Sequence, residues 1–442
     1  MYSRSQDFVR RLPAEGVPRI AGSPADPLGV ERPPSLARKL VEFLLYVSIA
    51  NSAFAIVLGV AVVPYIGGAL ITASGMLTLI IMFFQREPIP ATLWFALIVN
   101  FGASFSQGVR GEPPMVGEGL ATMMHWMNYQ LMICYLVRND AARNRILVFF
   151  SVLLILTIMF GSTTERDVVA GRIDLSEGVA SCFTNPNRLG HICAMLSVAL
   201  LFWSLRCAKV LRPLLWVMVA ILTFYMFGTV TRGAVLSFAC GVAVLCAAIV
   251  LGRGMRVGGI VLIGAAILAM SQFAYMFADS LDFLEDRMQE RSSRYGVYSM
   301  GTVRNLVDTT FVGWGTNKKV HMTRAAAGIE AHNSLLYMHM SFGGFTAWVY
   351  LAWIIMLLVR LARMVRAPDW PLAVRLEVVA LFGMMLASHL LQNQGYVYIT
   401  SMFAVGVAEK YCSPYSGRRI AERAVAALRN PHTEAVPQQF PV

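Results

Sequence analysis

The stretch GAVLSFACGVAVLCAAIVL, residues 233–251, contains nineteen consecutive residues without a charged side chain. A bilayer with about 30 Å of hydrocarbon requires about 20 such residues from each helix that crosses it. Similar stretches recur along the 442-residue chain, of which 57% is hydrophobic and only 14% charged, whereas about 25% of the residues of a soluble domain are charged. The sequence therefore predicts an all-α, polytopic membrane protein and excludes a soluble one.

Twelve apolar segments predict twelve transmembrane helices. Their approximate bounds are 41–63, 65–84, 89–107, 115–137, 145–162, 188–205, 211–229, 233–251, 257–275, 334–359, 374–392 and 396–410. They form a predicted membrane domain over residues 41–411, between an N-terminal tail (1–40) and a C-terminal tail (412–442). The N-terminal tail is polar, basic and contains proline, so we interpret it as a disordered cytoplasmic tail and not as a cleavable signal peptide.

The distribution of basic residues predicts how the chain is oriented. With the N-terminus in the cytoplasm, the short cytoplasmic connections carry thirteen Lys or Arg residues and the short external connections carry five. The cytoplasmic connections of membrane proteins typically carry this excess. The net charge of +12 is therefore interpreted mainly as an orientation signal, with both tails cytoplasmic, and not as a surface for nucleic acid.

The external segments are where we expect any chemistry. The five basic residues of the short external connections have no role in orientation, so each needs a partner or a function; they are Arg110, Arg166, Arg172, Arg188 and Arg232. Two external stretches are longer than a turn, at about 161–187 and 276–331. The second has seven basic and seven acidic residues, and its first half has the apolar spacing of an amphipathic helix on the outer membrane surface.

Two arginines of these segments could bind phosphate. Arg232, in GTVTRGAVLSF, lies at the outer mouth of a predicted span, where a guanidinium could bind a lipid-linked phosphate or could simply snorkel to the interface. Arg294, in ERSSRYG, precedes an apolar helical stretch that ends in Gly313-Trp314-Gly315. Taken alone, the pattern around Arg294 favours one more charge on a solvated amphipathic face.

Histidine and asparagine residues lie at the start of two other predicted spans. His332, at the end of the long loop, could remove a proton near neutral pH, whereas Asn333 could cap the helix that follows. The NPN sequence at 185–187 is compatible with an ordinary helix start. His191, one turn further, is interpreted as a core histidine. No nucleotide-binding, zinc or DxD metal motif occurs in an external segment, so we expect neither a metal nor a cofactor.

The order of these motifs along the chain indicates a family. NPN (185–187), TRG (231–233), SSRY (292–295) followed by GWG (313–315), and HN (332–333) resemble the motifs of the O-antigen ligase and polymerase superfamily of bacterial membrane glycosyltransferases. This resemblance implies a GT-C-like fold in the inner membrane. It also implies that a glycan passes from undecaprenyl diphosphate to an acceptor hydroxyl at the periplasmic face, with inversion at the anomeric carbon and without a metal ion.

The resemblance assigns roles to particular residues. Arg232 and Arg294 would bind the diphosphate and stabilise the negative charge that grows on it, and His332 would take the proton of the acceptor hydroxyl. Further substrate contacts are expected from Arg172, Asn185, Asn187 and Asn333. The acceptor would be the lipid A core for a ligase or a lipid-linked repeat unit for a polymerase, and the sequence does not decide between them.

A secondary transporter or a flippase of lipid-linked oligosaccharides is the alternative interpretation. It would use polar residues of the predicted fourth and eleventh spans, namely Glu118, His125, Asn128, His389 and Gln392. Against it, the two halves of the chain show no repeat, and few charged residues are expected in mid-membrane. A membrane scaffold, with the long loop as its partner surface, is a third interpretation.

Overall fold

The structure, a computed structural model, describes residues 35–57, 64–85, 87–109, 118–161, 186–229, 231–253, 305–314, 333–366, 372–391 and 399–412. Within these ranges the chain is helical and has no strand, and all of them belong to one compact unit, Pro34–Arg418. Four predicted parts lie outside the described residues: the tails before residue 35 and after residue 412, residues 162–185 of the first external stretch, the span at 257–275, and the long loop apart from 305–314.

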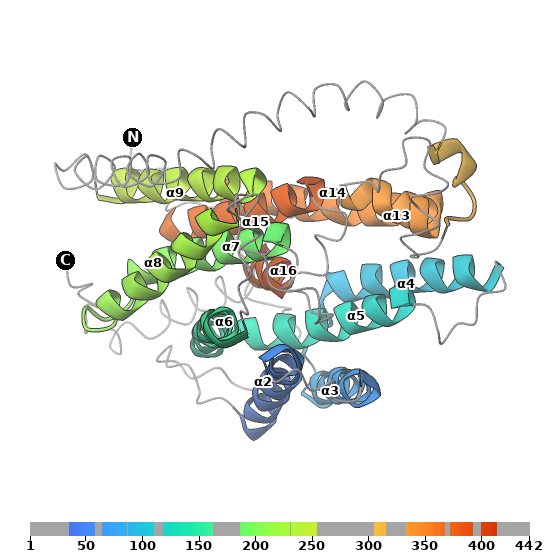
Figure 1. Ribbon diagram of the computed structural model, residues 1–442, viewed down its shortest axis with the longest axis horizontal. Coiled ribbons are helices and arrows are strands. Elements are labelled where there is room, and N and C mark those ends of the chain that lie inside the picture. Colours follow the sequence, from blue (N-terminus) through green and yellow to red (C-terminus); the bar gives the residue numbers. More distant parts are fainter. Residues whose placement is uncertain are drawn as a thin grey trace, which may run out of the picture. The chain divides into compact units, whose positions relative to one another are not determined.

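The helices follow the hydropathy of the sequence (Figure 1). In chain order they are α2 (Leu36–Val57), α3 (Pro64–Phe84), α4 (Ala91–Val109), α5 (Glu118–Val137), α6 (Asp140–Gly161), α7 (Pro186–Ser204), α8 (Arg212–Gly228), α9 (Arg232–Arg253), α13 (Ser334–Phe342), α14 (Gly344–Arg366), α15 (Leu372–Leu391) and α16 (Ile399–Cys412). Among the described residues, each predicted span therefore contains helix. An apolar segment satisfies its backbone polar groups in this way without water.

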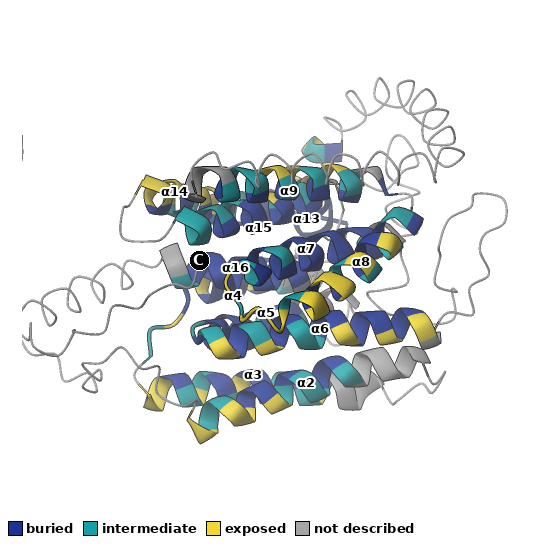
Figure 2. Cartoon of the chain, turned by 90° about the vertical axis from the view of Figure 1, so that its left-hand side faces the viewer, coloured by how far each residue is buried: buried dark blue, intermediate teal, exposed yellow. Residues whose placement is uncertain are grey.

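Three of the described helices contain a stretch long and apolar enough to cross a membrane: Asp140–Met159 of α6, Gly344–Arg366 of α14 and Leu372–Leu390 of α15. Shorter apolar stretches lie in α3, α4, α7, α8 and α9. Many large apolar side chains are also exposed, and Figure 2 shows exposed positions along α2, α3 and α6. Soluble monomers rarely expose apolar patches of more than a few hundred Å². The described part therefore fits a helical membrane protein.

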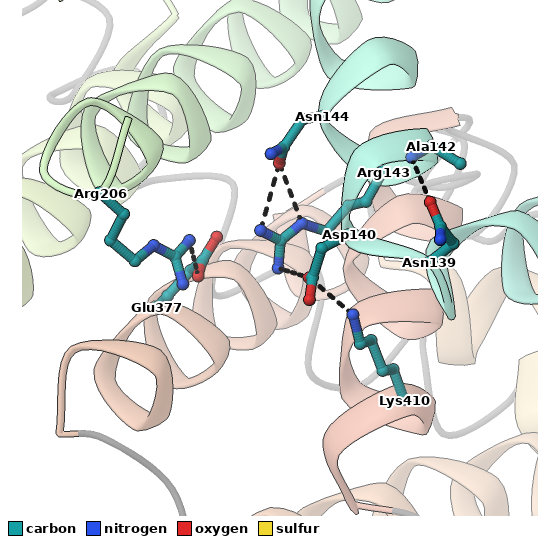
Figure 3. A network of polar contacts seen from close by, with 8 residues as sticks. All are labelled: Asn139, Asp140, Ala142, Arg143, Asn144, Arg206, Glu377 and Lys410. Atoms are coloured by element: carbon teal, nitrogen blue, oxygen red, sulfur yellow. Dashed lines mark hydrogen bonds and ion pairs between the residues drawn. The ribbon is translucent and has the colours of Figure 1, made fainter. Parts of the chain in front are cut away.

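Ion pairs join several helices at one of their ends (Figure 3). Lys410, near the end of α16, has its Nζ 2.6 Å from Oδ1 of Asp140, the first residue of α6. The same carboxylate oxygen lies 3.2 Å from Nη1 of Arg143, one turn further along α6. Arg206, just after α7, pairs with Glu377 near the start of α15.

Two further pairs extend this network. Arg145 of α6 binds both oxygens of Glu42 near the start of α2, through Nε at 2.6 Å and Nη2 at 2.7 Å. Glu409, near the end of α16, lies 3.3 Å from Nη1 of Arg360 in α14 and accepts a hydrogen bond of 2.8 Å from Thr92 at the start of α4. We call the starts of α2, α4, α6 and α15 with the ends of α7, α14 and α16 the ion-paired end. Its arginines, Arg143, Arg145, Arg206 and Arg360, are among the thirteen basic residues that the sequence assigns to short cytoplasmic connections.

The prediction of one continuous helix over 334–359 is wrong. The chain forms α13, breaks at Gly343 and continues as α14. Gly343 has φ +91°, which residues with a Cβ rarely adopt, and glycine does not interrupt an apolar pattern, so hydropathy missed the break. Asn333, just before α13, donates to Leu390 of α15, and Tyr350 of α14 stacks on the adjacent His389, whereas a continuous helix would separate Asn333 from Tyr350 by about 25 Å. α13 therefore folds back on α14, and the two helices form a hairpin.

A segment of the long loop, residues 305–314, packs against the break. The amide of Gly344 donates to the carbonyl of Thr310 at 3.0 Å, and the amide of Trp314 donates to the carbonyl of Met340 at 2.5 Å. A Cβ on Gly313 would lie 2.2 Å from the backbone of the hairpin, so only glycine allows this contact. These hydrogen bonds satisfy backbone groups that the break releases from the helix.

Candidate functional site

Four of the seven predicted site residues lie outside the described residues, namely Arg172, Asn185, Arg294 and His332. Asn187 is the second residue of α7 and Arg232 the first residue of α9, and their side chains lie outside the described part. Asn333 is described in full and directly precedes α13. The surroundings of these three positions show which motifs the fold brings together.

The helices that begin with NPN and TRG are parallel and in direct contact. A Cβ on Gly190 of α7 would lie 3.0 Å from the Cβ of Thr231, just before α9. A Cβ on Gly241 of α9 would lie 2.7 Å from Cγ2 of Val198 in α7. Gly190, early in α7, thus meets the start of α9, and Val198, further along α7, meets Gly241, further along α9. The two N-terminal ends, and with them the two motifs, lie side by side.

Two buried threonines support this junction. Oγ1 of Thr229 lies 2.7 Å from the carbonyl of Met226 and 3.0 Å from Oγ1 of Thr231. The carbonyl of Thr231 accepts the amide of Ala234 at 3.0 Å, which starts α9. These threonines and Gly190 were not among the site residues predicted from the sequence. Their only signal was a pair of hydroxyl side chains between two apolar spans.

The HN motif reaches the same end through α15. Because Glu377 near the start of α15 pairs with Arg206 after α7, α15 runs antiparallel to α7, and it packs against both α7 and α9. Its last turn therefore lies beside the starts of α7 and α9. In that turn the carbonyl of Leu390 accepts a hydrogen bond of 3.3 Å from Nδ2 of Asn333. The described members of the three motifs, 186–187 of NPN, 231–233 of TRG and Asn333 of HN, thus gather opposite the ion-paired end.

Asn333 is the N-cap of α13, as its position predicted. Its Oδ1 accepts the amides of Leu335 at 2.9 Å and Leu336 at 3.2 Å, and its backbone is extended, with φ −149°. Together with the bond to Leu390, three hydrogen bonds hold this side chain. The chain therefore enters α13 at a point defined by two helices.

Gly313 and Trp314 of the GWG motif and Asn333 of the HN motif belong to one substructure. Trp314 is 5% exposed and packs against Met340 and Leu336 of α13. Oγ1 of Thr309 lies 3.0 Å from Nδ1 of His339, also in α13. The segment 305–314 therefore contacts α13 along most of its length, and a displacement of this part of the long loop would displace the helix that Asn333 begins.

The polar residues of the transporter interpretation face different neighbours. His125 and Asn128 contact α3, because Cβ atoms on Gly68 and Gly75 would lie 3.0 Å from His125 Nε2 and 2.0 Å from Asn128 Oδ1. His389 instead stacks on Tyr350 of α14, with ring centroids 5.8 Å apart. The side chain of Glu118, and Gln392, lie outside the described residues. The described polar residues of the transporter interpretation therefore contact different helices, His125 and Asn128 contacting α3 and His389 contacting α14.

Among the described residues, no three His, Cys, Asp or Glu side chains group as metal ligands would. Comparison of the chain with protein-family models finds no matching family, and comparison with curated proteins finds no match either.

Proposed function

We propose that this protein is a glycosyltransferase of the bacterial inner membrane, which passes a glycan from undecaprenyl diphosphate to an acceptor hydroxyl at the periplasmic face. The observation that carries the proposal is the convergence of the starts of α7 and α9 with Asn333 at the end opposite the ion pairs. In the proposed topology of twelve spans, the ion-paired end is cytoplasmic and the convergent end is periplasmic.

Two parallel helix starts favour an anionic ligand. The first amides of an α-helix have no partner within the helix, and the aligned peptide dipoles add partial positive charge there. Because α7 and α9 begin side by side, both starts act on the same volume. Arg232 is the first residue of α9 and adds a full charge with a fork of donors that suits phosphate. In this proposal Arg294 supplies the second guanidinium.

The proposed reaction needs one base and a stabilised leaving group. The acceptor oxygen attacks the anomeric carbon as the bond from this carbon to the phosphate oxygen breaks, and the bonding electrons leave with undecaprenyl diphosphate. Attack from the face opposite the leaving group inverts the anomeric carbon. Arg232 and Arg294 stabilise the charge of the leaving diphosphate, and His332 accepts the acceptor's proton. In this proposal Asn333, whose side chain is held by three hydrogen bonds, fixes the chain directly after the proposed base.

A reconstituted transfer assay tests this proposal. The purified protein in nanodiscs receives a glycan on undecaprenyl diphosphate, with EDTA, and either lipid A core or a second lipid-linked repeat unit as acceptor. We expect transfer to one acceptor with release of undecaprenyl diphosphate, and its loss in Arg232→Ala, Arg294→Ala and His332→Ala. Transfer to lipid A core identifies a ligase, and chain extension identifies a polymerase.

The same assay contains the results that would contradict the proposal. The absence of transfer to both acceptors would remove the enzymatic function, and full activity of His332→Ala would remove its role as the base. If the original protein were inactive in EDTA and an added divalent cation restored transfer, the arginines would not be sufficient to stabilise the leaving group. Arg363→Ala serves as the matched control, because Arg363 is an exposed arginine near the end of α14, at the ion-paired end.

A further inference from the structure

His191 is a buried histidine of α7 whose ring nitrogen has no partner. It is 3% exposed, and within the part of the chain that the structure describes no group forms a hydrogen bond with its Nε2. A buried polar atom without a hydrogen-bond partner lowers the stability of the folded protein. The interpretation of His191 as a core histidine explains its burial but leaves Nε2 unexplained.

The position of His191 relates it to the two helix starts. It follows Asn187 by four residues, which puts both on one side of α7, and it precedes Val198 by seven residues, which puts it on the side that meets Gly241 of α9. Side chains of an α-helix lean towards its N-terminus. The imidazole of His191 therefore leans towards the level where α7 and α9 begin.

A second buried histidine provides the contrast. His389 is 4% exposed and its Nε2 is also unpartnered. Its Nδ1 lies 2.7 Å from the carbonyl of Met385 and donates to it, so Nε2 of the neutral ring is an acceptor. Nε1 of Trp353 is a buried donor without a partner, and the two ring centroids lie 6.4 Å apart. His389 thus has a hydrogen-bond partner within its own helix and two aromatic neighbours in α14.

We propose that His191 is a ligand-binding residue whose Nε2–H donates a hydrogen bond to an oxygen of a diphosphate bound at the starts of α7 and α9. This inference rests on the proposed function and adds a residue to its donor site. His191 forms the floor of the site, one helical turn below Asn187, and the diphosphate supplies the partner that its ring nitrogen lacks.

Three variants, His191→Gln, His191→Asn and His191→Leu, distinguish the loss of the Nε2 hydrogen bond from the loss of the ring's volume. A glutamine amide reaches the position of Nε2, an asparagine amide reaches only the position of Nδ1, and leucine retains volume without a donor. Each purified variant in nanodiscs is titrated with undecaprenyl diphosphate, undecaprenyl monophosphate and inorganic pyrophosphate, and its Kd is measured. His389→Leu is the control, because it removes an equally buried histidine that faces Tyr350.

We expect His191→Leu and His191→Asn to weaken undecaprenyl diphosphate binding by about 10-fold or more, since a hydrogen bond to a charged group contributes about 1.5–3 kcal/mol. His191→Gln and His389→Leu should stay within about threefold of the original protein. Tight binding of pyrophosphate alone would identify the free anion, and not the lipid, as the ligand; the monophosphate should bind more weakly than the diphosphate.

Stability without ligand gives an independent readout. If Nε2 serves a ligand, His191→Leu removes an unpaired buried atom, and the apparent Tm of the unliganded protein stays equal or rises. A lower Tm with unchanged diphosphate binding would overturn the inference, as would equal weakening by His389→Leu. Normal binding and transfer by His191→Leu would overturn it while the proposed function stands. Failure of the original protein to bind undecaprenyl diphosphate would overturn both.

Discussion

Replacement of Gly313 by alanine should detach residues 305–314 from the α13–α14 hairpin. The added Cβ would lie 2.2 Å from the amide nitrogen of Phe342 and 2.3 Å from the carbonyl oxygen of Ser341. These are backbone atoms, which cannot rotate away as the end of a flexible side chain can. Gly343, at the break, has φ +91°, and a Cβ added to it would lie 2.8 Å from the carbonyl oxygen of Phe311, so the hairpin has little freedom to yield.

The cost follows from the hydrogen bonds that detachment breaks. The amides of Gly313, Trp314 and Gly344 donate to Ser106 Oγ, Met340 O and Thr310 O at 3.4, 2.5 and 3.0 Å. At about 1 kcal/mol net for each hydrogen bond, their loss amounts to about 3 kcal/mol, before the exposure of Trp314 is added. Since about 1.4 kcal/mol corresponds to a factor of ten, the segment should open roughly 100-fold more often.

Hydrogen exchange measured by mass spectrometry on the protein in nanodiscs tests this magnitude. Peptides that contain Trp314 and Gly344 should exchange roughly 100-fold faster in Gly313→Ala, while peptides of α7 and α9 remain unchanged. Gly108→Ala is the matched control, because a Cβ on Gly108 of α4 would meet no atom within 4 Å. Unchanged exchange around Trp314 in Gly313→Ala would refute the contact between the loop and the hairpin.

Three further predictions concern the helix junctions. Gly190→Ala should separate the starts of α7 and α9, since its Cβ would lie 2.6 Å from the hydroxyl oxygen of Thr229. We expect it to lower both the apparent Tm and the affinity for undecaprenyl diphosphate. Gly383→Ala, whose Cβ would meet no atom within 4 Å, should change neither. Asn333→Ala should destabilise the protein by about 1–2 kcal/mol in thermal unfolding through loss of the cap, and Asn333→Asp should recover part of this loss. Arg206→Ala should lower the stability of the folded protein by about 3–5 kcal/mol, because it leaves the 4% exposed carboxylate of Glu377 unpaired. If the double variant Arg206→Ala, Glu377→Leu lost as much stability, the unpaired carboxylate would not be the cause.

Much of the helical structure could be predicted because hydropathy is a local property. The run at 233–251 forms α9, and the asparagine that the sequence placed before the tenth span caps a helix there. The same local criterion failed at Gly343, because glycine is as compatible with an apolar run as with a turn at positive φ. Composition alone does not distinguish a continuous span from a hairpin of two helices.

For the candidate site, too, the sequence predicted local features, and the tertiary structure decided how they come together. The sequence by itself placed the starts of α7, α9 and α13 to within two residues, since helix starts depend on capping residues and on the polarity of neighbouring residues. Only the tertiary structure decided that these starts gather at one end. That arrangement depends on contacts between residues far apart in the chain: Gly190 with Thr231, Asn333 with Leu390, and Gly313 with the hairpin break. Each is set by close backbone approach or by a single hydrogen bond, and neither leaves a periodic pattern in the sequence.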